Sequence, residues 1–159
     1  MAQNNRRLGR ECALKILFAT KLSEGTGAGA LLEQFWSSFR FADDVLGEPL
    51  ESLDNPVPTA VRVFTETLVC GVIDSRPALD RAISEVATKW SLDRMARVDL
   101  SILRIGAFEL LYRPDIPGRV TINEAIEIAK RYGSKESPAF INGLLDKIAK
   151  NCQKSEPLP

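Results

Sequence analysis

LSILRIGAFELLY, residues 100–112, carries apolar side chains on nearly every side of the helix that its spacing predicts. Isoleucine, leucine and alanine recur at intervals of three and four residues, which is the period of an α-helix, and they also occupy positions in between. A helix that is apolar almost all round is buried in a protein core. The segment therefore predicts the central helix of an all-helical domain.

The chain that follows predicts another helix with defined ends. RPDIPG, residues 113–118, contains two prolines and a glycine and breaks the helical pattern. Thr121 and Glu124 then have the spacing of a capping box, in which each side chain bonds the backbone N–H of the other residue. The apolar stripe after them reaches Gly133, a residue suited to a C-terminal cap.

The last predicted helix is amphipathic and begins at Ser137 and Pro138, because proline is favoured in the first turn of a helix. Its stripe of isoleucine and leucine continues to residue 150. Residues 151–159, NCQKSEPLP, are predicted to form a C-terminal tail.

Helical spacing also dominates the first half of the chain. Apolar stripes occur in four segments, residues 5–22, 31–39, 59–73 and 74–90. GEPLESLDNPVP, residues 47–58, has three prolines and several acidic residues and is predicted to be a surface loop. About seven helices with short connections predict an all-α, single-domain bundle over residues 1–150.

Composition argues against several classes of function. The chain has no histidine, which removes the commonest general base, the usual catalytic triads and most transition-metal sites. Its three cysteines are widely spaced and form no CxxC pair, so neither a zinc site nor a disulfide framework is indicated. No phosphate-binding loop is present, and no pair of carboxylates has the spacing of an acid and a base. We expect no enzyme, no cofactor and no metal.

The same composition predicts a soluble, cytoplasmic protein. The polar start, MAQNNRRLGRE, does not have the form of a signal peptide. No apolar run approaches the roughly 18 to 20 residues that a membrane span requires. Unpaired cysteines fit a reducing compartment.

The formal net charge of zero conceals an uneven distribution. Residues 1–21 carry five basic side chains and one acidic, and residues 130–154 carry six basic and two acidic, so each end has a net charge of +4. Residues 22–129 carry 10 basic and 17 acidic side chains, a net charge of −7. Two basic ends and an acidic body suggest surfaces for two kinds of partner, although solvated helix faces also produce such clusters.

Two motifs near the C-terminus identify a relationship. VTINEAIEIAKRYG, residues 120–133, followed by FINGLLDKIA, residues 140–149, resembles the NusB family of bacterial transcription antitermination factors. RRLGRECALKILF, residues 6–18, resembles the arginine-rich opening of the first helix in that family. The resemblance covers residues 6–150, is weakest around residues 47–58, and implies a helical domain without catalysis or a cofactor.

The resemblance also implies partners. NusB proteins pair with a small-subunit ribosomal protein, also called NusE, and together bind the boxA element of nascent ribosomal RNA transcripts. The pair joins other Nus factors on RNA polymerase and suppresses premature termination. Single-stranded RNA binding combines cations for the phosphates with aromatic faces on which bases stack, and this sequence offers both.

Two groups of residues match the RNA-binding positions that the resemblance implies. Arg6, Arg7 and Arg10 form the first, although Leu8 and Gly9 interrupt a basic run that is often denser in the family. The second group combines cations with aromatic residues: Lys130, Arg131, Tyr132, Lys135 and Phe140. Both aromatic residues also fall on apolar stripes, so their spacing is equally typical of core packing.

The acidic body is expected to receive the protein partner. Carboxylates such as Asp99 and Glu109 can steer a basic ribosomal protein, and Asp99 matches a region that the family uses for that partner. An N-cap of the following helix is the alternative for Asp99. Phe18, with Cys12 and Ile16, fits either internal packing or the partner interface.

Other interpretations stay open at this point. Asn123 and Asn142, in the INEA and FING segments, are expected to cap or bridge helices in preference to binding a ligand. The chain could instead be a non-catalytic RNA-binding domain related to that of ribosomal RNA cytosine methyltransferases. It could also be a homodimer that masks its RNA face, and the sequence does not distinguish a monomer from a homodimer.

Overall fold

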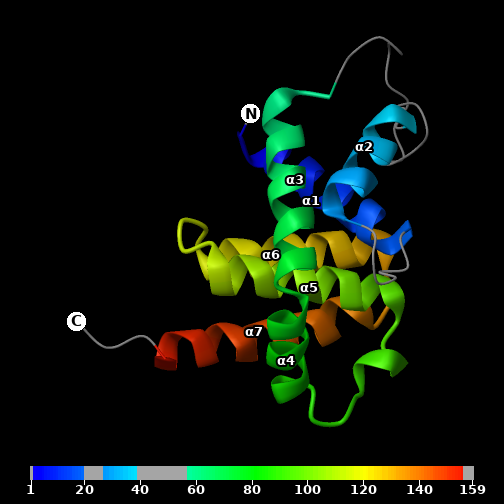
Figure 1. Ribbon diagram of the computed structural model, residues 1–159. Coiled ribbons are helices and arrows are strands. Elements are labelled where there is room, and N and C mark those ends of the chain that lie inside the picture. The colour runs from blue at the N-terminus through cyan, green and yellow to red at the C-terminus, as the bar shows by residue number, and fades with distance from the viewer. Residues whose placement is uncertain (1, 20–26, 39–56, 156–159) are drawn as a thin grey trace. The chain divides into compact units, whose positions relative to one another are not determined.

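The computed structural model describes residues 2–19, 27–38 and 57–155, and all regular structure in these ranges is helical (Figure 1). The α-helices are α1 Ala2–Ala19, α2 Ala28–Ser38, α3 Thr59–Asp74, α4 Arg76–Val86, α5 Arg97–Tyr112, α6 Gly118–Tyr132 and α7 Ser137–Ser155, and a short 3-10 helix, η1, spans Leu92–Arg94. The prediction of an all-α fold of about seven helices is confirmed. The predicted loop at 47–58 lies outside the described residues except for its last two.

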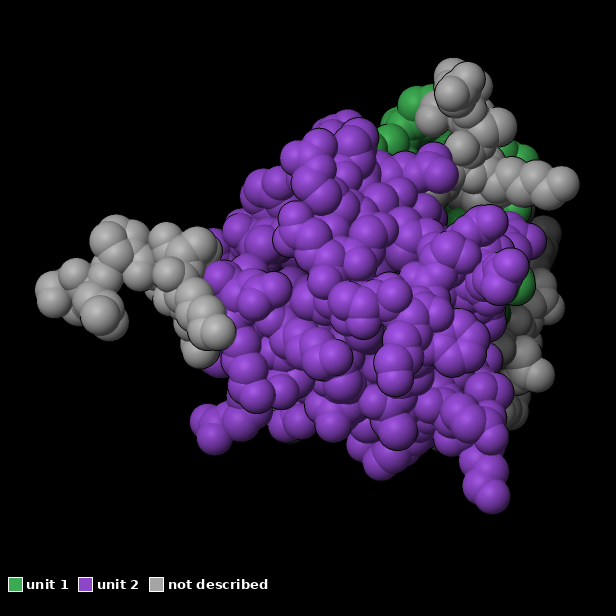
Figure 2. All heavy atoms as spheres, turned by 90° about the horizontal axis from the view of Figure 1, so that it is seen from below, with its two compact units in different colours: residues 1–73 green, residues 74–159 purple. Residues whose placement is uncertain are grey.

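The chain divides into two compact units, residues 1–73 and 74–159, which Figure 2 colours green and purple. Unit 1 holds α1, α2 and nearly all of α3, and unit 2 holds α4 to α7. Each unit has its own buried apolar side chains. A single domain over residues 1–150 stays a prediction.

Unit 2 is built around α5, as the sequence predicts. Nine of its 16 residues are buried, and it packs against α4, α6 and α7. Gly106 lets α7 come close, because a Cβ atom at this position would lie 2.8 Å from Cδ1 of the fully buried Leu145. An ion pair joins α5 to α4, with Arg104 Nε 2.8 Å from Asp80 Oδ1 and Nη2 3.1 Å from Oδ2.

In unit 1, α1 and α3 meet at a glycine. A Cβ atom on Gly9 would lie 2.9 Å from Cδ1 of Phe64. The Thr65 hydroxyl donates to the carbonyl oxygen of Val61 at 2.7 Å and lies 3.3 Å from that of Gly9. The glycine that interrupts the basic run of α1 is therefore needed for the packing of this unit.

Two predicted helix ends, at Gly133 and at Ser137, are confirmed. Gly133 is the C-cap residue of α6, and its N–H donates to the carbonyl of Ala129 at 2.9 Å. Helix α7 begins at Ser137.

Two predicted boundaries are wrong. Thr121 is not an N-cap, because α6 begins at Gly118 after Pro117, whose ring fixes a backbone angle suited to a helix start. Thr121 is thus inside the helix, where its side chain has another use described below. At the C-terminus, α7 continues to Ser155, so the first five residues of the predicted tail are helical.

Candidate nucleic-acid interface

The arginines of α1 are gathered around one aromatic ring. The guanidinium carbons of Arg6 and Arg10 lie 5.2 Å and 5.3 Å from the centre of the Phe64 ring, within the range of a cation–π interaction. Their spacing of four residues places both on the face of α1 that meets α3. The residues differ in exposure, since Arg6 and Arg7 are half-buried whereas Arg10 is only 3% exposed.

The burial of Arg10 argues against a direct contact with RNA, which stays a prediction for this residue. Its side chain supports the packing of α1 against α3, and its charge is not presented at the surface. Arg6 and Arg7 keep enough exposure to meet a phosphate. The sequence could not separate the three, because helical spacing alone places Arg6 and Arg10 on the same face.

Cys12 shares this buried environment. Its thiol is fully buried, and burial, reinforced by the negative charge of Glu11, raises the pKa of Cys12 to about 12. The thiol is therefore protonated and unreactive at neutral pH. Ile16, 2% exposed, packs in the same unit, so both residues belong to the core and not to a partner surface.

The second predicted group lies where α6 ends and α7 begins. A short turn joins the helices, in which the backbone N–H of Ser134 donates to the hydroxyl of the buried Ser137 at 2.9 Å and the two hydroxyls lie 3.1 Å apart. Lys130, Arg131 and Lys135 are exposed around this turn. Three cationic side chains are thus positioned by the last turn of α6 and the short turn that follows it.

Two aromatic residues accompany these cations. The guanidinium carbon of Arg131 lies 5.5 Å from the centre of the half-buried Tyr132 ring. Phe140 is also half-buried and meets a further ring, Trp90, edge to face at 6.1 Å and 79°. Neither predicted aromatic residue is wholly in the core, so both stay candidates for contact with bases.

Trp90 is a candidate site residue that the sequence pattern did not indicate. It continues the apolar stripe of Ile83 and Val86 at helical spacing, which indicates burial. However, α4 ends at Val86, and the turn that follows leaves Trp90 56% exposed beside Phe140. The prediction that the helix continues through residue 90 is wrong. We define the basic–aromatic patch as four exposed residues and two half-buried rings around the junction of α6 and α7: Trp90, Lys130, Arg131, Lys135, Tyr132 and Phe140.

Of the three predicted partner residues, Phe18 has the expected exposure. Its ring, near the end of α1, is 40% exposed, which suits a contact with another protein. Asp99 is the third residue of α5, after the N-cap Ala96, so the capping alternative for Asp99 is wrong. Asp99 is 9% exposed, and among the described residues its Oδ1 atom has no hydrogen-bond partner.

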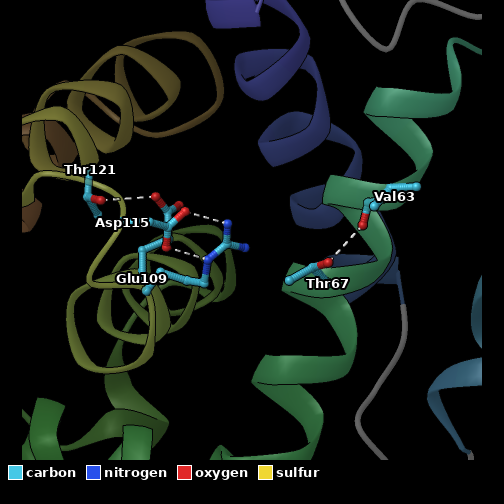
Figure 3. A network of polar contacts seen from close by, with 6 residues as sticks. Val63, Thr67, Glu109, Asp115 and Thr121 are labelled. Carbon is cyan, nitrogen blue, oxygen red and sulfur yellow. Dashed lines mark hydrogen bonds and ion pairs between the residues drawn. The ribbon is translucent and has the colours of Figure 1, made fainter.

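Glu109 does not have the predicted role at a surface. The residue is 1% exposed, and its Oε1 atom accepts a hydrogen bond of 2.9 Å from the hydroxyl of Thr121, shown in Figure 3. Helices α5 and α6 are thereby joined by a buried polar contact. The sequence pattern did not predict this hydrogen bond, because it assigned the Thr121 side chain to a capping box that does not form.

Asn123 and Asn142 are not bridging residues. Both are exposed, and within the described part of the chain neither side chain has a hydrogen bond. They line a groove between α6 and α7, so the expectation of a purely structural role is not supported. We name this feature, lined by Gly118, Arg119, Ile122, Asn123, Asn142, Asp146, Ala149 and Lys150, the α6–α7 groove.

These observations define a class of protein: an all-helical chain with exposed cations and aromatic rings held together at one end of unit 2. In the described residues, no helix combines the length and the apolar character needed to cross a bilayer.

The family follows from comparison with known proteins. The chain belongs to the NusB family, whose sequence model matches residues 7–150. It is 54% identical to the transcription antitermination protein NusB of Syntrophotalea carbinolica over 154 residues, which are 96% of this chain and 97% of that protein.

Solved structures agree with this assignment. The structure of NusB from T. maritima is 35% identical, with a TM-score of 0.72, and the match covers 91% of this chain and 90% of that one. A crystal structure of the antitermination factors NusB and NusE in complex with double-stranded RNA has the same fold at 19% identity, with a TM-score of 0.72 and coverage of 93% and 98%.

Proposed function

We propose that this chain is a transcription antitermination factor which, with the ribosomal protein NusE, binds boxA-type RNA of nascent ribosomal RNA transcripts. In this role it joins RNA polymerase with other Nus factors and helps the enzyme to read through terminators. The observation that carries the proposal is the basic–aromatic patch, in a chain whose relatives are antitermination proteins. The role requires no catalysis and no cofactor, and its place is the cytoplasm.

The patch has the chemistry that single-stranded RNA requires. Lys130, Arg131 and Lys135 supply positive charge for phosphates, although Lys130 also forms an exposed ion pair of 3.1 Å with Glu127. Trp90, with more than half of its surface free, offers a face on which a base can stack. Arg6 and Arg7 provide a second set of cations in unit 1, and we propose that residues 1–150 act together as one RNA-binding domain.

The protein partner would use different side chains. Phe18 presents an exposed ring, and Asp99 has a buried carboxylate oxygen that a donor from a partner could satisfy. A basic ribosomal protein would also be attracted by the negative charge of residues 22–129. This division assigns RNA to Trp90 and to the cations of the two basic ends, and assigns the protein partner to Phe18, Asp99 and the negative charge of the acidic body.

The test is a titration followed by fluorescence anisotropy. A labelled boxA RNA, a scrambled single strand and a duplex are each titrated with the chain, alone and with NusE, at fixed salt concentration. We expect the boxA strand to bind more tightly than the scrambled strand, and NusE to increase this preference several-fold. Equal affinity for all three RNAs with NusE present would contradict the proposal.

Oligomeric state is measured in the same samples. Sedimentation of the free chain distinguishes a monomer from a homodimer, and sedimentation with RNA shows whether a dimer dissociates on binding. A dimer that persists and excludes RNA would favour the alternative in which the RNA face is masked.

A further inference from the structure

The α6–α7 groove lies outside every residue assigned so far to RNA or to the protein partner. Its volume is about 370 Å³, and its lining comes only from the first two turns of α6 and from the middle of α7. Asn123 contributes a carboxamide from one helix and Asn142 contributes another from the facing helix. The groove therefore offers two sets of hydrogen-bond donors and acceptors from rigid elements.

The polar groups of the groove are available to a ligand. Among the residues that the structure describes, Arg119, Asn123 and Asn142 take part in no hydrogen bond or ion pair. Lys150 and Asp146 form an ion pair of 2.9 Å, with both side chains more than half exposed. Because that pair is neutral overall, Arg119 leaves the groove with one excess positive charge.

We propose that the α6–α7 groove receives one unstacked nucleotide of the RNA and reads the edge of its base. Asn123 and Asn142 donate to and accept from the base edge, as carboxamides do in specific recognition of nucleic acids. Arg119 contacts the adjoining phosphate. Ile122 and Ala149 provide small apolar contacts for the base. The inference rests on the proposed function, since it requires that the chain bind RNA.

The position of the groove supports a single RNA strand as the occupant. Asn123, Glu127 and Lys130 are all exposed and are spaced by four and three residues, so they follow one face of α6. At 1.5 Å per residue, Asn123 and Lys130 are separated by about 10 Å along the helix axis. One strand can therefore occupy the basic–aromatic patch and continue into the groove. The patch would supply affinity and the groove would supply sequence preference.

The experiment compares wild type with the double variant Asn123→Ala, Asn142→Ala. The probes are single-stranded boxA-type RNAs in which each base in turn is replaced by the other three. Asn151→Ala is a matched control, because Asn151 is an exposed asparagine of α7 that does not line the groove. Thermal unfolding of each variant verifies that these exposed substitutions leave the fold intact.

We expect wild type and Asn151→Ala to distinguish the bases at one position of the RNA by about tenfold, and the double variant to lose that distinction. Base preferences at the other positions should persist. A double variant with an unchanged preference at every position would overturn the inference and leave the proposed function intact. Wild type that binds none of the RNAs would overturn both.

A second measurement separates phosphate contact from base contact. Arg119→Ala should lower the magnitude of the slope of log K against log salt concentration by about 0.7 and leave base preference unchanged. Arg81→Ala removes an equal charge from an exposed site on α4 and should leave the slope as it is in wild type. If the groove variants weakened NusE binding and left RNA binding unaltered, the groove would be a protein site and the inference would be wrong.

Discussion

Arg7 and Arg10 are three residues apart on α1, yet they face different environments. Arg10 is 3% exposed with its guanidinium against the Phe64 ring, while Arg7 is half-buried. A buried guanidinium contributes to packing through its aliphatic stem and its contact with the ring. A partly exposed one can neutralise a phosphate. Removal of Arg10 should therefore lower stability, whereas removal of Arg7 should weaken RNA binding.

We expect Arg10→Ala to lower the free energy of unfolding by about 2 kcal/mol, since it removes a buried side chain. Arg7→Ala should leave stability within about 0.5 kcal/mol of wild type and weaken RNA binding, with a salt slope smaller by about 0.7. Urea unfolding and anisotropy titrations measure the two quantities on the same preparations. A stable Arg10→Ala with a reduced salt slope would show that Arg10 does reach the RNA.

Trp90 is the side chain with the largest expected effect on RNA affinity. Base stacking on an aromatic side chain contributes about 1–3 kcal/mol, so Trp90→Ala should weaken binding roughly tenfold. Trp90→Phe keeps a ring and should retain most of the affinity. The stability of both variants should stay close to wild type, because the residue is 56% exposed. Equal affinities for wild type and Trp90→Ala would place Trp90 outside the interface.

Cys12 makes stability depend on pH in the alkaline range. Its pKa is about 12 in the folded chain against an ordinary value of 9.0, so the unfolded chain releases the proton first. The free energy of unfolding must therefore fall as the pH rises above 9.0, the ordinary pKa of the thiol. Between about pH 8 and pH 10, wild type should lose about 1.4 kcal/mol more than Cys12→Ala does. Urea unfolding of both proteins at the two pH values measures this difference, and parallel losses would contradict the assignment.

At the scale of elements, α5 and α7 depend on a glycine at their closest approach. An added methyl at Gly106 would meet the buried Leu145, and overpacking of this kind costs about 1–3 kcal/mol, which exceeds the gain in helix propensity of about 1 kcal/mol. Gly143 is also within a helix, but an added methyl there would meet no atom within 4 Å.

Gly106→Ala should therefore destabilise the chain by about 1 kcal/mol, and Gly143→Ala should stabilise it by about 0.5–1 kcal/mol. Thermal unfolding of the two variants beside wild type gives the signs directly. Two shifts in the same direction would mean that propensity, and not the space between α5 and α7, decides the outcome.

The helices could be predicted from the sequence where the spacing of apolar residues determines them. Residues 100–112 are apolar nearly all round, and α5 is the buried centre of unit 2. Boundaries were less predictable, because Thr121 and Glu124 have capping-box spacing while Pro117 starts the helix one turn earlier.

Tertiary contacts were beyond the sequence pattern. Arg10 is buried against Phe64, which is distant from it in the sequence. Glu109 is buried against Thr121, which the sequence pattern had assigned to a capping box. Trp90 is exposed in the turn that follows the end of α4 at Val86. The spacing of residues along one helix does not show which other helix packs against it. The environments of side chains at contacts between helices were therefore predicted wrongly.

At the scale of the whole molecule, the two proposed surfaces should respond separately to mutation. Phe18→Ala removes an exposed ring from unit 1 and should weaken NusE binding about tenfold, with RNA binding in the absence of NusE unchanged. Val63→Ala is a control, since Val63 is another exposed apolar residue of unit 1, at 57% exposure. Calorimetric titration with NusE measures the first effect and anisotropy with boxA RNA the second. Parallel losses of both activities in Phe18→Ala would contradict separate surfaces.

The chain has two tryptophans, and each unit contains one of them. Trp36 of unit 1 packs edge to face with Phe35 and beneath the guanidinium of Arg62, whereas Trp90 of unit 2 is exposed beside Phe140. Tryptophan fluorescence, excited at a wavelength that tyrosine does not absorb, can therefore follow either unit by itself. Trp36→Phe leaves a tryptophan only in unit 2, and Trp90→Phe leaves one only in unit 1. Coincident unfolding curves from the two variants would mean that the two units unfold as one cooperative block. Separated curves would mean that the unit with the higher midpoint stays folded after the other has unfolded.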